Sequence, residues 1–127
     1  MHFLEYETWR LKKDIDPAAY DDIIRDWFKF LRDNYERLFP EWISARYYRQ
    51  TDRDGNPTGV FIMVFEYESI EAHHAYKERR KNWDGPYEAY KAVDPDQEFF
   101  DLETTTTEYW QPQKEDLWFD CKDKSRT

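Results

Sequence analysis

The chain has 127 residues, a formal net charge of −9 and an isoelectric point near 4.8. This acidity works against nucleic-acid binding, which favours a basic face, and against anionic lipid surfaces. No segment approaches the roughly 20 apolar residues of a membrane span, and the N-terminus lacks a leader pattern. Cys121 is the only cysteine, so an internal disulfide and a cysteine-based zinc cage are excluded. We therefore expect a soluble, cytoplasmic protein.

Aromatic residues make up 20% of the chain: nine Phe, ten Tyr and six Trp. Each aromatic side chain removes about 150–250 Å² from water when it is buried, so a fraction of them would already form a large core. The charged residues are interleaved with these rings, which argues against disorder. Length and composition together predict one folded domain.

The first half of the chain reads as strand, helix, hairpin. Residues 3–12 alternate large and charged side chains and predict a strand. Asp16 can cap the helix that follows, and Pro17 suits its first turn. Apolar residues recur at helical spacing from Ile23 to Leu38, and Pro40 ends the helix.

Two more strands follow, at residues 42–51 and 59–68, joined by the turn cluster 52–57. They are expected to form a hairpin. Residues 60–65 are apolar on both faces, so we predict that the third strand is central in its sheet.

Ser69 can cap a second helix that runs to about residue 82. Residues 83–86 interrupt it, and residues 87–93 predict a further short helix. A β-branched run within residues 99–110 predicts the last strand.

We accordingly place one domain at residues 1–110 and a tail at residues 111–127. The tail is mostly polar, but residues 117–119 (LWF) are too apolar to remain in water. They are expected to dock on their own domain or on a partner.

The element order βαββαβ predicts an α+β, ferredoxin-like fold: a four-stranded antiparallel sheet with both helices on one face. The other face would carry aromatic, aliphatic and charged groups together. A small protein usually covers such a face by pairing with a copy of itself. We therefore predict a homodimer whose two sheets enclose a lumen, a dimeric α+β barrel.

Two short segments resemble known families. The opening strand of NIPSNAP-type proteins is similar to residues 5–12 (EYETWRLK). The strand-to-helix junction of that group and of the antibiotic-biosynthesis monooxygenases resembles residues 65–69 (FEYES) followed by Glu71 and Ala72. Both groups belong to the dimeric α+β barrel superfamily, so the resemblance, which spans roughly residues 3–110, implies that fold. The superfamily includes cofactor-free monooxygenases and haem-degrading enzymes. Where haem-degrading relatives place their ligand histidine, this chain has Asn82, which weakens haem as a cofactor.

Strand parity suggests which side chains would face the lumen, because alternate residues share a face. If Phe100 and Leu102 point to the helices, Asp101 and Glu103 point to the lumen. If Leu4 and Tyr6 do the same in the first strand, Glu5, Glu7 and Trp9 join those carboxylates. The second and third strands would add Arg46, Tyr48, Met63, Phe65 and Tyr67.

Clustered carboxylates in a dry pocket repel one another, so one should have a raised pKa or a cation should sit among them. A raised-pKa carboxylate could remove a proton from a phenolic or enolic substrate, the step that opens a cofactor-free oxygenation. We assign this role to Glu103, Glu7 or Tyr67, and predict no metal and no cofactor. Two alternatives remain: a hard cation bound through oxygen, or a structural network paired with Arg46, Arg10 or Arg49.

Two further residues could bind a ligand. His73 and His74 are adjacent on the second helix and point about 100° apart, so one of them could reach the cavity as a proton shuttle or ligand, or could be a packing residue. Trp83 lies in the helix break, where it could form a lid or fill the core. The predicted ligand-binding set is Trp9, Arg46, Tyr48, Met63, Phe65, His73, Trp83 and Asp101.

Two functions fit these features. The first is a small-ligand enzyme, monooxygenase-like, that acts on a small apolar or aromatic molecule. The second is a non-catalytic binding or assembly protein whose lumen is filled by its own rings. An enzyme needs an open cavity of roughly 300 Å³ or more, which separates the two. An RNA-binding use of the sheet is disfavoured by its acidic groups.

Overall fold

Four antiparallel strands form one sheet in the order β2-β3-β1-β4. The computed structural model describes residues 2–81 and 86–122. Its elements are β1 (Phe3–Leu11), α1 (Pro17–Asp33), α2 (Tyr35–Leu38), β2 (Trp42–Thr51), β3 (Pro57–Tyr67), α3 (Ile70–Arg80), α4 (Pro86–Val93), α5 (Asp96–Phe99), β4 (Phe100–Trp110) and the 3₁₀ turn η1 (Glu115–Leu117).

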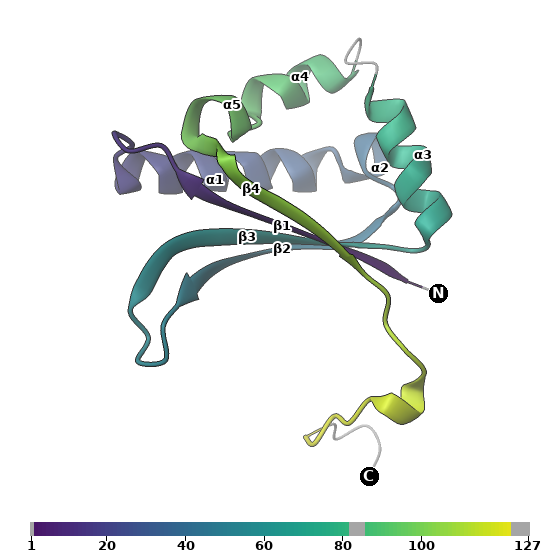
Figure 1. Cartoon of the computed structure of the whole chain (residues 1–127). Coiled ribbons are helices and arrows are strands. Elements are labelled where there is room, and N and C mark those ends of the chain that lie inside the picture. The colour runs from purple at the N-terminus through teal and green to yellow at the C-terminus, as the bar shows by residue number, and fades with distance from the viewer. Residues whose placement is uncertain (1, 82–85, 123–127) are drawn as a thin grey trace.

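The fold is ferredoxin-like, as the order of elements predicts. All helices from α1 to α5 lie on one side of the sheet (Figure 1). The predicted central position of β3 is confirmed, and β1 pairs with β4 on its other side. None of the described helices covers the other side of the sheet, which we call the open face (Figure 1). In the described part of the chain, no helix is long and apolar enough to cross a membrane.

Helix starts follow their predicted caps. The Asp16 side chain accepts a hydrogen bond from the Ala18 N–H at 3.1 Å, with Pro17 as the first helical residue. The first helix does not run unbroken to Leu38, because it is interrupted at Asn34. Both the backbone N–H and the side-chain amide of Asn34 donate to the Phe30 carbonyl, at 3.1 and 2.9 Å. This competition from a side-chain donor ends α1 one turn early.

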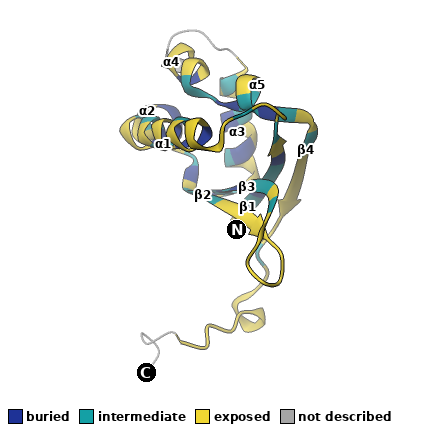
Figure 2. Ribbon diagram, turned by 90° about the vertical axis from the view of Figure 1, so that its left-hand side faces the viewer, coloured by how far each residue is buried: buried dark blue, intermediate teal, exposed yellow. Residues whose placement is uncertain are grey.

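The core lies between the sheet and the helices, where buried residues gather in Figure 2. It is built largely from stacked rings: Trp9 stacks on Phe100 with centroids 4.1 Å apart, and Phe39 on Trp42 at 4.3 Å. The buried Trp9 indole N–H donates to the Tyr20 hydroxyl at 3.1 Å. Much of the aromatic-rich composition therefore goes into one buried layer on one side of the sheet.

The faces predicted for β1 and β3 were wrong. Phe3, Glu5 and Trp9 are buried on the helix side, whereas Leu4 and Tyr6 lie on the open face. In β3, the residues predicted for the lumen are buried on the helix side, while Ile62 and Val64 line the open face. Side chains do alternate between the two faces. The prediction directed Leu4 and Tyr6 toward the helices, but the alternate residues, whose larger rings bury more area, take that side. The residues reassigned to the helix side are Glu5, Glu7, Trp9, Met63, Phe65 and Tyr67.

Parity also fails along β4, because the strand contains an irregularity. Thr8 pairs with Thr106, but Arg10 pairs with Asp101, so residues 102–105 have only one residue opposite them. The Thr104 hydroxyl accepts from the Arg10 N–H at 2.9 Å and donates to the Asp101 carbonyl at 2.6 Å. Leu102 and Glu103 are exposed there. Counting alternate residues across such a bulge loses the register.

The start of α3 depends on Ser69, whose hydroxyl accepts from the Ala72 N–H at 3.0 Å. We expect Ser69→Ala to lower the free energy of unfolding by about 1 kcal/mol, because the cap is lost. Chemical denaturation of the variant and of Ser44→Ala tests this. The Ser44 hydroxyl caps no helix, so its loss should cost less, and equal losses for the two variants would contradict the capping role.

Candidate functional site

A buried carboxylate, Glu5, lies at the centre of the candidate site. Its residue is 2% exposed. The Tyr67 hydroxyl donates to its Oε1 at 3.1 Å. On the other oxygen, Lys77 Nζ lies 3.3 Å from Oε2 and His73 Nε2 lies 3.7 Å from it. We call Glu5, Tyr67, His73 and Lys77 the Glu5 cluster.

The sheet register and one helix bring the Glu5 cluster together. Glu5 pairs with Phe65 on β3 and with Tyr109 on β4, so it sits in the middle of the β3-β1-β4 ladder. His73 and Lys77 are four residues apart on α3, and residues at that spacing share one helix face. The chain passes from β3 into α3 directly after Tyr67. One partner of the Glu5 carboxylate therefore comes from β3, and two come from α3.

His73 is buried, at 6% exposure, without the hydrogen bonds that such a group needs. Among the described residues, neither of its ring nitrogens has a hydrogen-bond partner, because the 3.7 Å separation from Glu5 is too long for one. Three rings enclose it: Tyr67 at 4.8 Å, Phe3 at 5.1 Å and Tyr109 at 5.2 Å between centroids. Buried polar atoms are rarely left unpaired, so the imidazole is a candidate proton acceptor.

Burial decides the protonation states around Glu5. It lowers the pKa of His73, although the nearby Glu5 carboxylate opposes the shift, so the imidazole is mainly neutral at pH 7. Burial and then the charge of Glu5 raise the pKa of the Tyr67 hydroxyl, which stays protonated. The same two causes raise the pKa of Glu7. The site thus holds the neutral imidazole of His73 and the protonated hydroxyl of Tyr67 beside the buried carboxylate of Glu5.

The structure brings together part of the predicted site. Glu7 lies two residues along β1 from Glu5, so these two carboxylates are neighbours as expected. Tyr67 and His73 join them, and Trp9, Met63 and Phe65 are buried in the core on the same side of the sheet. Asp101 and Glu103 are not part of this group, since they lie at the β4 bulge opposite Arg10.

Arg46 and Tyr48 lie elsewhere. They line a groove of about 430 Å³ on the open face, together with Leu4, Tyr6, Ile62 and Val64. The predicted pairing of Arg46 with the Glu5 and Glu7 carboxylates is therefore wrong, because the sheet separates them. Lys77 is the cation beside Glu5, and sequence reasoning missed it. Its spacing of four residues from His73, which puts both side chains on one helix face, is the sequence feature that could have identified it. Trp83 falls outside the described residues.

A second ion pair fixes the end of α3. Arg80 Nη2 lies 3.3 Å from Asp94 Oδ2, just before α5. Burial, followed by the charge of Asp96, raises the pKa of Asp94 to about 7. A further titratable group with a shifted pKa, Asp94, therefore lies on the helix side of the sheet, as the Glu5 cluster does.

The electrostatics can be tested by NMR titration of the histidines. We expect the pKa of His73 to lie below the ordinary value of about 6.5 and to fall further in Glu5→Gln, because the carboxylate favours the imidazolium. His73→Gln identifies the signal. Glu7→Gln is the matched control, and it should shift the pKa of His73 less. An unchanged titration in Glu5→Gln would show that the two groups are not coupled.

Comparisons with known proteins support the fold. No protein-family profile matches the chain, and no curated protein sequence matches it. Solved structures do match, at low identity. A dimeric protein of unknown function with a ferredoxin-like fold from Bacteroides fragilis has a TM-score of 0.57 and 6% identity, covering 87% of this chain and 95% of its own.

Two further matches correspond to the families named from the sequence. A NIPSNAP family protein of unknown function from Agrobacterium tumefaciens gives a TM-score of 0.58 at 15% identity, with 87% of each chain covered. A variant of SnoaB, a cofactor-independent oxygenase from Streptomyces nogalater, gives a TM-score of 0.54 at 10% identity, covering 89% of this chain and 94% of that one. The expected resemblance to NIPSNAP-type and monooxygenase-like proteins is confirmed for the fold.

Proposed function

We propose that this protein is a homodimer that binds a small aromatic or apolar molecule and moves a proton from it through the Glu5 cluster. The reaction class is proton removal from a phenol or enol, followed by reaction of the resulting anion with molecular oxygen. One oxygen atom forms a new C–O bond, the O–O bond breaks, and the other oxygen atom leaves as water with two hydrogens from the substrate, which is oxidised to a quinone or ketone. The observation that carries the proposal is the buried carboxylate of Glu5 beside the unpaired imidazole of His73. Titratable groups whose pKa is shifted by burial, as that of His73 is, gather at functional sites.

In this proposal each member of the cluster has one task. Neutral His73 accepts the substrate proton, and Glu5, 3.7 Å away, stabilises the imidazolium that forms. The Tyr67 hydroxyl holds the carboxylate in place. Lys77 offsets the charge of Glu5, and its side chain is 35% exposed, so it also links the site to water. A phenolic substrate would need the rings of Phe3, Tyr67 and Tyr109 to move apart before it could reach His73 and stack against them.

Support for oxygen chemistry is more distant. SnoaB, which shares the fold, is described as a cofactor-independent oxygenase. Carrying that reaction to this chain needs an acid–base group in a dry setting, and the Glu5 cluster supplies one. It replaces Glu103 as the carboxylate we place at the centre of the chemistry, while Tyr67 and Glu7 remain in the proposal.

Support for the homodimer comes from the open face. Its groove combines aliphatic and aromatic side chains with Arg46 and Glu66, a surface that a second copy can cover. The Bacteroides fragilis protein of the same fold is described as dimeric. Two copies packed through their open faces would leave both Glu5 clusters on the outer, helix-covered sides.

A second candidate function is non-catalytic binding. It is favoured by the dense ring packing around the cluster, which includes Tyr76 and Phe65 as well as Tyr67. In that case the Glu5 cluster would be a structural network and would turn over nothing. Turnover separates the two functions.

Catalysis can be tested by oxygen consumption with 1-naphthol and related phenols as probes. We expect His73→Asn and Glu5→Gln to lower the rate by about 100-fold, the usual contribution of a general base. The control is Glu103→Gln, an identical change at an exposed carboxylate, which should leave the rate unaltered. Equal rates in Glu5→Gln and wild type would remove the cluster from the chemistry.

The dimer can be tested by two separate variants, each of which replaces one isoleucine with glutamate. Ile62→Glu places a charge on the open face and should convert the dimer to a monomer in light scattering after size exclusion. Ile70→Glu makes the same change at an exposed position in the first turn of α3 and should leave the dimer intact. A dimer that persists in Ile62→Glu would place the interface elsewhere.

A further inference from the structure

Three consecutive apolar residues in the tail lie in water. Leu117 is 70% exposed, Trp118 48% and Phe119 85%. Leu117 is the last residue of η1 and the other two follow it, on a segment that leaves the end of β4 and runs away from the helices, past the open-face side of the sheet (Figure 1). Contiguous apolar groups of this size mark an interaction site on a soluble protein.

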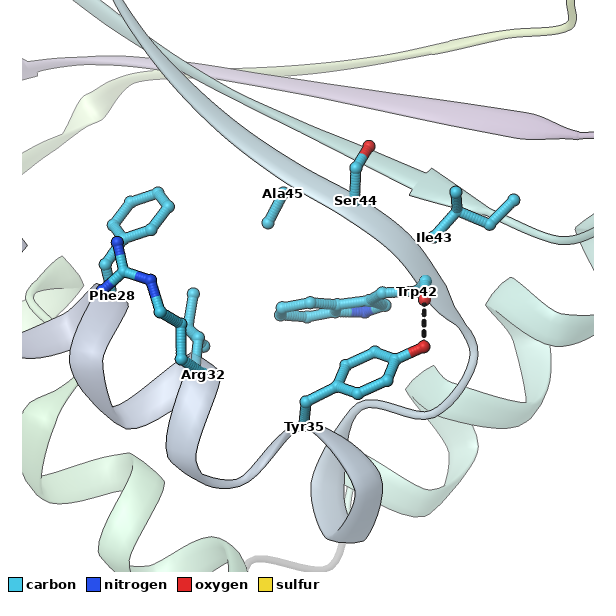
Figure 3. Close-up of a pocket in the computed structure, with 8 residues that line it drawn as sticks. Phe28, Arg32, Tyr35, Trp42, Ile43, Ser44 and Ala45 are labelled. Carbon is cyan, nitrogen blue, oxygen red and sulfur yellow. Dashed lines mark hydrogen bonds between the residues drawn. The ribbon is translucent and has the colours of Figure 1, made fainter.

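The domain carries a groove of matching chemistry. It has a volume of about 520 Å³ and lies between α1 and the start of β2, away from the Glu5 cluster. Figure 3 shows Tyr35 and Trp42 along its floor, with Phe28 and Arg32 on one wall and Ile43 at the other end. The Tyr35 hydroxyl donates to the Trp42 carbonyl at 2.8 Å, which fixes the start of α2 against the start of β2. The groove is therefore aromatic, pre-formed and bordered by a cation.

Charge complementarity connects the tail with the groove. The three apolar residues of the tail are flanked by acidic residues, Glu115 and Asp116 before them and Asp120 after them. Arg32 is the charged residue that lines the groove, and the two hollows beside it combine Arg25 and Arg37 with the acidic residues Asp21, Asp33 and Glu36. The acidic residues of the tail can pair with Arg32 at the groove, and the apolar residues between them can bury area against its rings.

The position of the tail favours the groove of another molecule over its own. β4 and β2 are opposite edges of the sheet, so the tail starts at the edge farthest from the groove of its own chain. It also runs off on the open-face side, whereas the groove is formed with α1 on the helix side (Figure 1). A second copy packed on the open face would lie in the direction that the tail takes.

We propose that residues 115–120 of one copy dock in the α1–β2 groove of a second copy, so that two tails are exchanged within a dimer. This inference rests on the homodimer of the proposed function and is independent of the chemistry at Glu5. Exchange would bury the three apolar residues of the tail and add two contacts outside the open-face interface.

Cross-linking of the full chain tests the exchange. Cys121, two residues beyond Phe119, is exposed and is the only native cysteine. Ile43→Cys places a second thiol at the rim of the groove, at a residue that is itself exposed. Mild oxidation should then join two chains, seen as a doubled mass without reductant. Asp54→Cys, in the exposed turn between β2 and β3, is the matched control, and Ile43→Cys with Cys121→Ser corrects for pairing between introduced thiols.

A second variant shows whether the apolar residues drive the docking. Trp118→Ser with Phe119→Ser, in the Ile43→Cys background, should reduce the cross-linked yield at least fivefold. Light scattering of the same samples before oxidation separates the outcomes. A dimer that cross-links no better than the Asp54→Cys control overturns the exchange but leaves the dimer. A disulfide within one chain places the tail on its own domain and also overturns the exchange, and a monomer overturns both.

Discussion

The burial of one carboxylate constrains the whole arrangement of this protein. Glu5 lies on the side of the sheet that the helices cover, where a charge is costly unless it is neutralised and hydrogen-bonded. The end of β3 supplies the hydroxyl of Tyr67, and one face of α3 supplies His73 and Lys77. Each partner reaches Glu5 only if β1 and β3 keep their register and α3 starts at the residue that Ser69 caps. A slip of one residue in either place would leave the carboxylate unpaired.

That constraint separates two surfaces with different tasks. The helix side is buried and aromatic, and burial shifts the pKa values of His73, Tyr67 and Glu7 there. The open face and the tail are mixed in character and exposed, which suits association with a second copy. Chemistry and assembly would therefore depend on opposite faces of one sheet, so variants of one need not disturb the other.

The sequence predicts the elements and their order well, since caps such as Asp16 and Ser69 and the helical spacing of large residues are local signals. The prediction fails where a residue's position depends on packing between elements that are distant in the sequence. Whether Trp9 or Leu4 faces the helices is decided by which set buries more area, and alternation alone gives both answers. The bulge after Asp101 depends on hydrogen bonds between distant strands. Lys77 was missed because its partner is 72 residues away, in β1.

The central claim is that the Glu5 cluster serves chemistry rather than stability, and the free energy of unfolding of Glu5→Gln at pH 7 tests it most directly. The amide keeps an oxygen for the Tyr67 hydroxyl, and Lys77 can reach water. A cluster kept for function therefore predicts a variant at least as stable as wild type. A loss of about 3 kcal/mol or more, the cost of breaking a buried pair, would contradict the claim and show that the network holds the fold together.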